Sequence, residues 1–405
     1  MSDSLASFTA PDSALGFLYQ VRCALLWSLQ RLRNESDFSV SLEALDDVAF
    51  EKEGTASELL QTKLHKNRSA NLTDASPDLW KTIRVWLTAS NSNVVQESTF
   101  LYLVTTEQAS SGSIAAYLKQ KQEDRDIDAA VTKLNNVAQT STSSSNAEAY
   151  KAYLGISYED RKKLVDRIII IDNSPGINDL DALLKKEIFH AASREHQTTF
   201  LEYLEGWWYR RALHQLQNIN SQDRILSEEI EAQMSDLRDQ FKQDSLPISD
   251  DLLNYELDGK TAEAHQSLPF VQQIHLATTH KKRIAAAIRD YYRAFEQRSR
   301  WQRQDLLFVG DLSQYEKSLT EEWELVFSRI EDRIGHEATD EDKQTAAKEV
   351  LDWVEIANVN ARIRPNVTEP FITRGSLHIL SNELKIGWHP DFRQRLAHLL
   401  EGGAR

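Results

Sequence analysis

Four polar residues between positions 39 and 65 have the types and spacing that phosphodiester chemistry requires. Asp46 and Asp47 are adjacent acids, and Gln61 and Lys63 stand two positions apart further along the chain. Mg²⁺ prefers oxygen ligands, so one or two carboxylates and an amide oxygen can hold it. The metal would polarise a phosphate and activate a bound water, while a lysine would offset the charge that develops. The segment therefore predicts a metal-dependent site for phosphodiester cleavage.

Strands must position these side chains, and the sequence has the pattern for three strands. Alternate side chains of a strand project from the same face, so Gln61 and Lys63 would lie together. A turn at Gly54 would pair the second and third strands as a hairpin and place Asp47 opposite Gln61 or Lys63. Apolar and polar residues alternate, as in half-buried strands, in segments 39–43, 47–51 and 58–65.

The strand register and the role of a nearby glutamine stay open at this point. Asp46 and Asp47 face opposite sides of a strand, so either acid could face the metal. Gln20, on the preceding helix, is a further candidate for the site. Alternatively, it is a helix-surface or capping residue. The polar side chains of the hairpin could also be no more than its solvated face.

Helices and a further strand surround the predicted hairpin. Leucines recur at helical spacing in residues 13–33. After the hairpin, Ser76 and Pro77 begin a second helix that extends to about residue 87. Residues 99–106 form an apolar run of strand length, so the order is helix, three strands, helix, strand. The apolar face of the second helix comprises Leu79, Trp80, Ile83, Trp86 and Leu87.

This order of elements, with an acid on the second strand and Gln-x-Lys on the third, resembles the restriction-endonuclease-like PD-(D/E)xK superfamily. It is similar to the Mrr-like variant, in which Gln replaces the second acid. Four motifs also resemble the nuclease domain of antiphage effectors, namely CD-NTase-associated endonucleases and Lamassu effectors. They are GFLYQ at 16–20, LEALDDV at 42–48, LQTK at 60–63 and DLWKTIRVW at 78–86.

The resemblance implies a role for each residue of the predicted site. It places metal ligation on Asp47 and Gln61, with Glu43 as a supporting acid and further ligand. It places the catalytic positive charge on Lys63. The implied cofactor is Mg²⁺ or Mn²⁺, and the implied substrate is double-stranded DNA.

Composition is that of a globular protein with two or more domains. The chain has 405 residues, of which 41% are hydrophobic, and about 150 residues is typical of one domain. Cys23 is the only cysteine, so we expect no intrachain disulfide and a reducing compartment. No apolar run reaches the roughly 18 residues of a membrane span, and the N-terminus lacks signal-sequence character. We therefore expect a cytoplasmic protein without membrane attachment.

The net charge of −15 does not favour nucleic acid, so DNA binding would depend on local clusters of basic residues. Lys66 and Arg68 follow the third strand, and Lys81 and Arg84 lie on the second helix. These four are the predicted DNA contacts. Segment 280–303 carries eight basic residues against two acidic ones. It could follow DNA, or it could pair with acidic helices of this chain or with a partner.

The predicted domain boundary is at residue 196. The run DRIIIID at 166–172 is typical of a buried strand in a mixed sheet, and a helix follows at about 178–196. We therefore expect an α/β nuclease domain over 1–196, in which helices flank a mixed sheet. The remaining 197–405 is expected to be mainly helical and to bind partners or form oligomers.

Motifs in the C-terminal half resemble those of effectors of ABC-type three-component systems, of which Lamassu is one. The glycine, tryptophan and proline residues near the end of the chain also predict a hairpin or loop within 369–395. The motifs are EGWWYRR at 205–211, RGSLHILSNE at 374–383 and GWHPDF at 387–392.

The two resemblances together imply an effector nuclease of a defence complex. Such a protein would be held inactive by an SMC-like ATPase with a small accessory subunit, and activated by release or by homo-oligomerisation. The sequence lacks the phosphate loop G-x-x-x-x-G-K-[ST], so any ATP use would belong to a partner. The alternative is a non-enzymatic scaffold whose nuclease fold has decayed.

Overall fold

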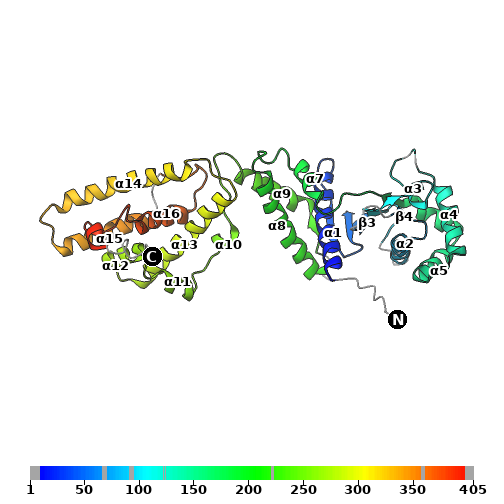
Figure 1. Ribbon diagram of the computed structural model, residues 1–405, viewed down its shortest axis with the longest axis horizontal. Coiled ribbons are helices and arrows are strands. Elements are labelled where there is room, and N and C mark those ends of the chain that lie inside the picture. Colours follow the sequence, from blue (N-terminus) through cyan, green and yellow to red (C-terminus); the bar gives the residue numbers. More distant parts are fainter. Residues whose placement is uncertain are drawn as a thin grey trace, which may run out of the picture. The chain divides into compact units, whose positions relative to one another are not determined.

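The chain divides into two compact units, Met1–Leu237 and Arg238–Arg405, and Figure 1 labels many of their elements. None of the helices that the structure describes has the length and apolar character needed to cross a membrane. The computed structural model describes residues 10–65, 71–90, 95–121, 123, 125–219, 223–356 and 361–396.

A mixed sheet forms the centre of the first unit. Its strands are β1 (Ser39–Leu42), β2 (Val48–Lys52), β3 (Thr55–Lys63), β5 (Phe100–Thr105), β7 (Ile168–Ile171) and β8 (Ile225–Leu226). Within the described residues the order is β7-β5-β3-β2-β1-β8. The strands from β8 to β3 pair antiparallel, whereas β3, β5 and β7 pair parallel. Two short strands, β4 (Asn71–Leu72) and β6 (Gln108–Ala109), pair separately.

A tight turn joins β2 to β3, and a bulge near this turn shifts their register. Lys52 pairs with Thr55, so only Glu53 and Gly54 lie between the strands. Both have positive φ, 50° and 76°, as a type I′ hairpin turn requires, and glycine adopts this conformation without strain. The register shifts by one residue at a β-bulge between Phe50 and Glu51, after which Phe50 pairs with Glu58 and Val48 with Leu60. The hairpin predicted around Gly54 is therefore present.

Helices cover both faces of the sheet (Figure 1). On one face, α2 buries Leu79, Trp80, Ile83, Trp86 and Leu87, which confirms the predicted apolar face of this helix. These side chains join a core with β3, β5, β7 and the helices that follow. The helices of this layer are α2 (Pro77–Ser90), α3 (Ile114–Tyr117), α4 (Ile127–Thr140), α5 (Ala147–Leu154) and α6 (Tyr158–Arg167).

The other face carries α1 (Ala10–Arg31), α7 (Leu180–Glu187), α8 (Gln197–Gln217) and the beginning of α9 (Ser227–Gln240). The indole N–H of Trp208 on α8 donates to the carbonyl of Val21 on α1, 2.8 Å away. Arg22 on α1 pairs with Glu205 on α8 and with Asp181 on α7. Because Trp208 is 1% exposed, α8 is a core element of this unit.

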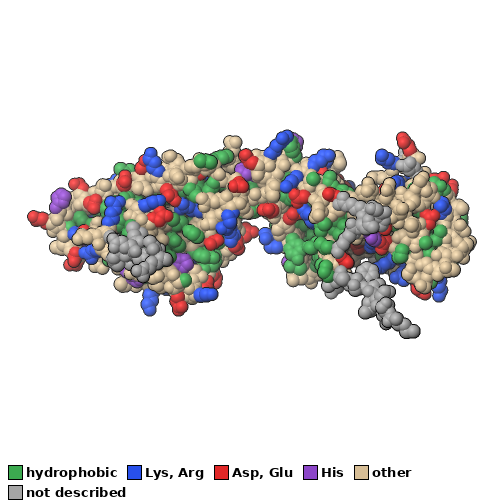
Figure 2. All heavy atoms as spheres, in the orientation of Figure 1, with side chains coloured by type: hydrophobic (Ala, Val, Ile, Leu, Met, Phe, Trp, Pro, Cys, Tyr) green, Lys and Arg blue, Asp and Glu red, His purple; other side chains and the backbone are tan. Residues whose placement is uncertain are grey.

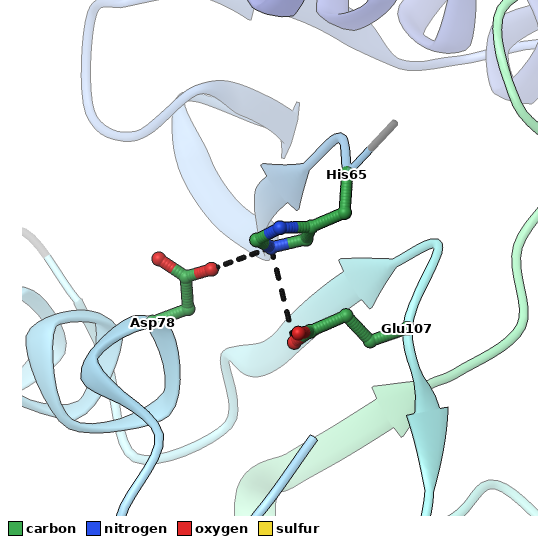
Figure 3. A group of neighbouring side chains, drawn as sticks. All are labelled: His65, Asp78 and Glu107. Carbon is green, nitrogen blue, oxygen red and sulfur yellow. Dashed lines mark hydrogen bonds and ion pairs between the residues drawn. The ribbon is translucent and has the colours of Figure 1, made fainter. Parts of the chain in front are cut away.

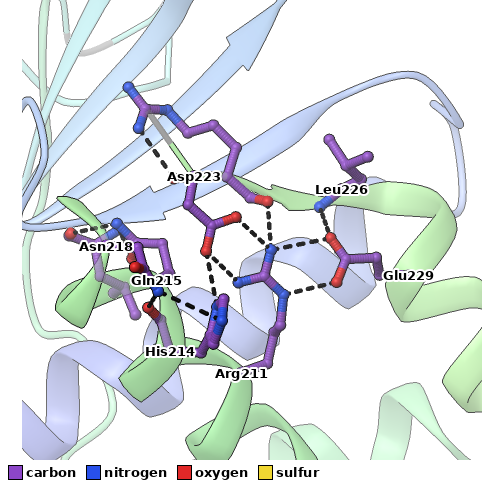
Figure 4. Close-up of polar contacts among 9 residues, drawn as sticks. Arg211, His214, Gln215, Asn218, Asp223, Leu226 and Glu229 are labelled. Carbon is purple, nitrogen blue, oxygen red and sulfur yellow. Dashed lines mark hydrogen bonds and ion pairs between the residues drawn. The ribbon is translucent and has the colours of Figure 1, made fainter. Parts of the chain in front are cut away.

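The end of α8 is also attached to the sheet (Figure 4). Gln215, fully buried, accepts from the Leu42 amide at 3.1 Å and donates to its carbonyl at 3.3 Å. Arg211 pairs with Asp223 and Glu229 and so holds the segment that leads into β8. These contacts place β8 along β1.

The first unit therefore extends to Leu237, beyond the boundary expected at residue 196. The expected boundary is too early because α8 and β8 complete the sheet and cover α1. The pair of residues in β8 is too short to give a strand pattern in the sequence.

The described part of the second unit is built from helices around its own apolar core. Its longest helices are α13 (Lys281–Arg303) and α14 (Asp311–Ile334). The others are α10 (Asp250–Leu253), α11 (Gly259–His265), α12 (Pro269–Ala277), α15 (Asp340–Ile356), α16 (Pro370–Asn382) and α17 (Phe392–Leu396). The mainly helical character expected for the C-terminal half agrees with this architecture.

Within the segment where a hairpin or loop was expected, residues 370–382 form the helix α16, and residues 383–391 form a loop that contains Gly387, Trp388 and Pro390. Gly375 lies within α16 and faces α13. A Cβ on Gly375 would lie 2.1 Å from the Asp290 carbonyl oxygen and 2.4 Å from the Ala294 Cβ. The absence of a side chain thus allows α16 to pack closely on α13.

Replacing Gly375 with Ala should destabilise the second unit by about 2 kcal/mol, since the added methyl would overlap the backbone of α13. Gly259→Ala is the matched control, because nothing lies within 4 Å of a Cβ there. Denaturant unfolding of the full chain measures both. Equal stability of the Gly375→Ala and Gly259→Ala proteins would contradict the packing role of Gly375.

Candidate active site

A short loop between β1 and β2 carries the three acids of the predicted site. Leu42 pairs with Val48, so residues 43–47 form the loop. Glu43 begins it with a positive φ of 56°, and its amide donates to the Asp47 carbonyl at 3.2 Å. The side-chain amide of Gln20, on α1, donates to the same carbonyl at 2.5 Å. Gln20 is 4% exposed, so it is a buried support of this loop and not a helix-surface residue.

Asp47 lies immediately before β2 and, by continuation of the register, opposite Gln61 on β3. Its Oδ1 accepts a hydrogen bond from Gln61 Nε2 at 2.8 Å. Its Oδ2 accepts from the amide of Thr62 at 2.7 Å and from the Thr62 hydroxyl at 3.1 Å. Three donors from β3 therefore fix the orientation of this carboxylate.

Gln61 and Lys63 lie on one face of β3, as the strand period predicts. Lys63 Nζ donates to Gln61 Oε1 at 3.1 Å. Gln61 is 8% exposed, whereas Lys63 is half-buried. The glutamine amide thus connects the acids on one side to the ammonium group on the other.

Asp46 also reaches Gln61, but it points into the protein interior. Its Oδ1 accepts from Gln61 Nε2, and its Oδ2 accepts from the indole N–H of Trp86, on α2, at 2.8 Å. Burial, together with the neighbouring Asp47 carboxylate, raises the pKa of Asp46 to about 6, although the Trp86 and Gln61 hydrogen bonds oppose the rise. Trp86 was expected only as a core residue, because its indole N–H gives no signal in the sequence pattern.

Glu43 completes the group from the exposed side of the loop. Partial burial raises the pKa of Glu43, and the Asp47 carboxylate adds to this rise, whereas Gln20 and Lys63 lower it. These electrostatic interactions place Glu43 near both Asp47 and Lys63. The structure therefore brings together Glu43, Asp47, Gln61 and Lys63. Asp46 lies on the buried side of this group.

The donor set suits a hard divalent cation. Glu43 and Asp47 offer carboxylate oxygens and Gln61 an amide oxygen, the ligand types that Mg²⁺ and Mn²⁺ take. Three carboxylates near one ammonium group leave excess negative charge, which a cation would offset. Ligation by Gln61 requires its amide to turn, because Oε1 accepts from Lys63 and Nε2 faces the two aspartates.

The predicted DNA contacts are only partly visible. Lys66 and Arg68 lie outside the described residues. Lys81 and Arg84 are exposed on α2, the helix that carries Trp86. His65 follows β3, and its Nε2 lies 2.7 Å from Asp78 Oδ2.

The basic helix α13 uses several of its cations inside the second unit. Ion pairs join it to neighbouring segments, and Figure 2 shows acidic and basic side chains interspersed over the visible face of this unit. The structure thus favours intramolecular pairing over DNA contact for these arginines. The pairs are Arg283 with Asp352 and Glu355, Arg298 with Glu316, and Arg300 with Asp251.

Residues 270–396 match the family model described as C-terminal domain 7 of the ABC-three component (ABC-3C) systems. The matched segment runs from α12 to α17. The match supports the interpretation that the protein is a component of an ABC-type three-component system. The sequence has no significant match among curated proteins.

Solved structures that resemble the chain include two Cap4 SAVED/CARF-domain containing receptors. The Moraxella osloensis protein has 14% identity and a TM-score of 0.36, and the Acinetobacter baumannii protein has 12% identity and a TM-score of 0.33. Each match covers 69% of this chain and 60% of the other. At these scores the likeness supports no conclusion about fold or function.

Replacing Trp86 with Phe should raise the pKa of Asp46 further, by about one unit, because the carboxylate loses the indole donor that favours its ionised form. Carbon-13 NMR of protein labelled at aspartate measures the titration. Trp80→Phe is the matched control, since Trp80 is equally buried on α2 but donates to the Asp74 carbonyl. An unchanged pKa in the Trp86→Phe protein would contradict the role of this hydrogen bond.

Proposed function

We propose that the protein is a metal-dependent double-stranded DNA endonuclease that acts as the effector of an ABC-type three-component antiphage defence system. The observation that carries the proposal is the convergence of Asp47, Gln61 and Lys63 across the β2–β3 hairpin. Asp47 and Lys63 both contact the Gln61 side chain, at 2.8 and 3.1 Å. A carboxylate, an amide and an ammonium group are thus held in a row.

The surrounding topology supports the proposal. An antiparallel β1–β2–β3 meander is followed by α2 and then by β5, which lies parallel to β3. Apart from the short strand β4, this is the order of helix, three strands, helix and strand that resembles the restriction-endonuclease-like superfamily. The acids lie in the loop between β1 and β2, just before the second strand on which the metal-binding acid was expected, and Gln-x-Lys ends β3.

The residues have distinct tasks in the proposed reaction. Asp47 and Glu43 would hold Mg²⁺ or Mn²⁺ with the Gln61 oxygen, and the bound metal would polarise the phosphate and activate a water. Lys63 would offset the negative charge that develops on the phosphate in the transition state. Asp46 accepts from both Trp86 and Gln61 Nε2, and its bond to Gln61 would be released when the amide turns toward the metal.

The C-terminal domain supports the second part of the proposal. A domain of the ABC-3C type over residues 270–396 is consistent with a protein that works with other subunits. We propose an SMC-like ATPase and a small accessory subunit as these partners, which would hold the nuclease inactive until its release or oligomerisation. A homo-oligomer would provide two active sites for the two DNA strands.

Lys63→Ala should lower plasmid cleavage by the full chain at least about 100-fold in Mg²⁺ or Mn²⁺, the order expected when one transition-state donor is removed. The matched control is Lys52→Ala on the same hairpin, an exposed lysine paired with Glu35. Its activity should stay close to that of the wild-type protein.

Gel analysis of nicked and linear plasmid measures this difference. Equal cleavage by the Lys63→Ala protein, or no cleavage by the wild-type protein with either metal, would contradict the proposal and favour a scaffold role.

Loss of both Lys81 and Arg84 should weaken DNA binding and reduce the salt dependence of the affinity. Each lost phosphate contact lowers the slope of log K against log salt by about 0.9. Lys162→Ala with Lys163→Ala on α6 is the control, since these exposed lysines pair with Asp128 and Glu97. Fluorescence anisotropy with a DNA duplex at several salt concentrations measures both proteins. An unchanged slope in the Lys81/Arg84 variant would remove α2 from the DNA interface.

A further inference from the structure

A second polar cluster lies beyond the end of β3, separate from the acids of the β1–β2 loop. It consists of His65, Asp78 and Glu107 (Figure 3). His65 Nε2 is 2.7 Å from Asp78 Oδ2 and 3.8 Å from Glu107 Oε2. The three potential ligand atoms all lie within 4.8 Å of one another.

Three different elements bring these side chains together. Lys63 pairs with Thr105 in the parallel β3–β5 ladder, and continuing this register places His65 beside Glu107. The amide of His65 donates to the Thr106 hydroxyl at 2.8 Å, and the amide of Thr106 donates to the Lys63 carbonyl at 3.2 Å. Asp78 comes from the first turn of α2. The cluster thus lies at the carboxyl ends of parallel strands, where α/β proteins commonly bind ligands.

Glu107 lacks a full complement of partners. The residue is 8% exposed, and its Oε2 has no hydrogen-bond donor among the residues that the structure describes. The Nε2 of His65 lies closer to Asp78, so a single N–H cannot serve both carboxylates well. A buried carboxylate oxygen without a hydrogen-bond donor destabilises the folded state. The Glu107 carboxylate points toward the His65 imidazole and the Asp78 carboxylate (Figure 3).

We propose that His65, Asp78 and Glu107 form a second cation site, of the type that binds Zn²⁺ or a similar divalent transition metal. One imidazole nitrogen and two carboxylates match the ligands of such ions. Zn²⁺ binds nitrogen and oxygen at about 2.0–2.2 Å, so its ligands lie roughly 3.3 Å apart. The observed spacing needs only small side-chain adjustments to reach this geometry.

The proposed cation would lie close enough to Lys63 to interact electrostatically with the candidate active site. The Lys63 ammonium interacts electrostatically with Glu43 and also with His65 and Asp78. Three protein ligands leave a fourth position open for water or a phosphate oxygen. The second cation would therefore bind next to the lysine that we propose for catalysis, and would not use any of the ligands assigned to Mg²⁺.

Isothermal titration of Zn²⁺ into the full chain tests the proposal. The titration uses Asp47→Asn protein, so that the first site is weakened and the second dominates the signal. We expect Zn²⁺ to bind this protein, and Glu107→Gln on the same background to bind at least about tenfold more weakly. Glu97→Gln is the matched control, an exposed glutamate before β5 that pairs with Lys163, and it should leave Zn²⁺ binding unchanged.

Thermal unfolding in a chelator shows whether the Glu107→Gln protein is folded, and His65→Gln provides a second variant that should also lose Zn²⁺ affinity. Equal Zn²⁺ binding with and without Glu107, or no binding to the Asp47→Asn protein, would overturn the proposal and leave the cluster as an ion-paired histidine. DNA cleavage is not a readout here, so either result leaves the test of the nuclease independent.

Discussion

The pairing of β2 with β3 is the constraint on which the candidate site depends. Glu53 and Gly54 form the tight turn between the strands, and a β-bulge between Phe50 and Glu51 then moves the register by one residue. A shift by one residue would turn Gln61 away from Asp47 and reverse the faces of β3. The turn and the bulge together therefore determine which polar groups meet at the strand ends.

The second constraint is the cost of holding several carboxylates together. Asp46 is kept beneath the site by Trp86 and Gln61, yet its pKa is raised from 3.8 to about 6. A carboxyl with a raised pKa in the folded state contributes its full stability below about pH 4, and the contribution is lost as pH rises through about 6. At neutral pH this arrangement therefore lowers the stability of the folded protein.

Local patterns in the sequence were enough to predict the hairpin, the face shared by Gln61 and Lys63, and the apolar face of α2. They could not decide between Asp46 and Asp47, because that depends on how the β1–β2 loop turns; in the structure both reach Gln61. The association of His65 with Glu107 depends on parallel pairing between strands distant in the chain, and β8 is too short to have a period. The close packing of Gly375 on α13 could not be predicted, because it depends on a contact between segments distant in the chain.

Gln215 on α8 bonds to both backbone groups of Leu42, one residue before Glu43, and β8 covers the outer edge of β1. These contacts determine where the chain can be truncated without exposing β1. A fragment that stops after residue 196 would lose both partners and would present β1 as an open edge, which favours aggregation by strand addition. A catalytic fragment would need to continue through α8 and β8, although these segments carry none of the proposed catalytic groups.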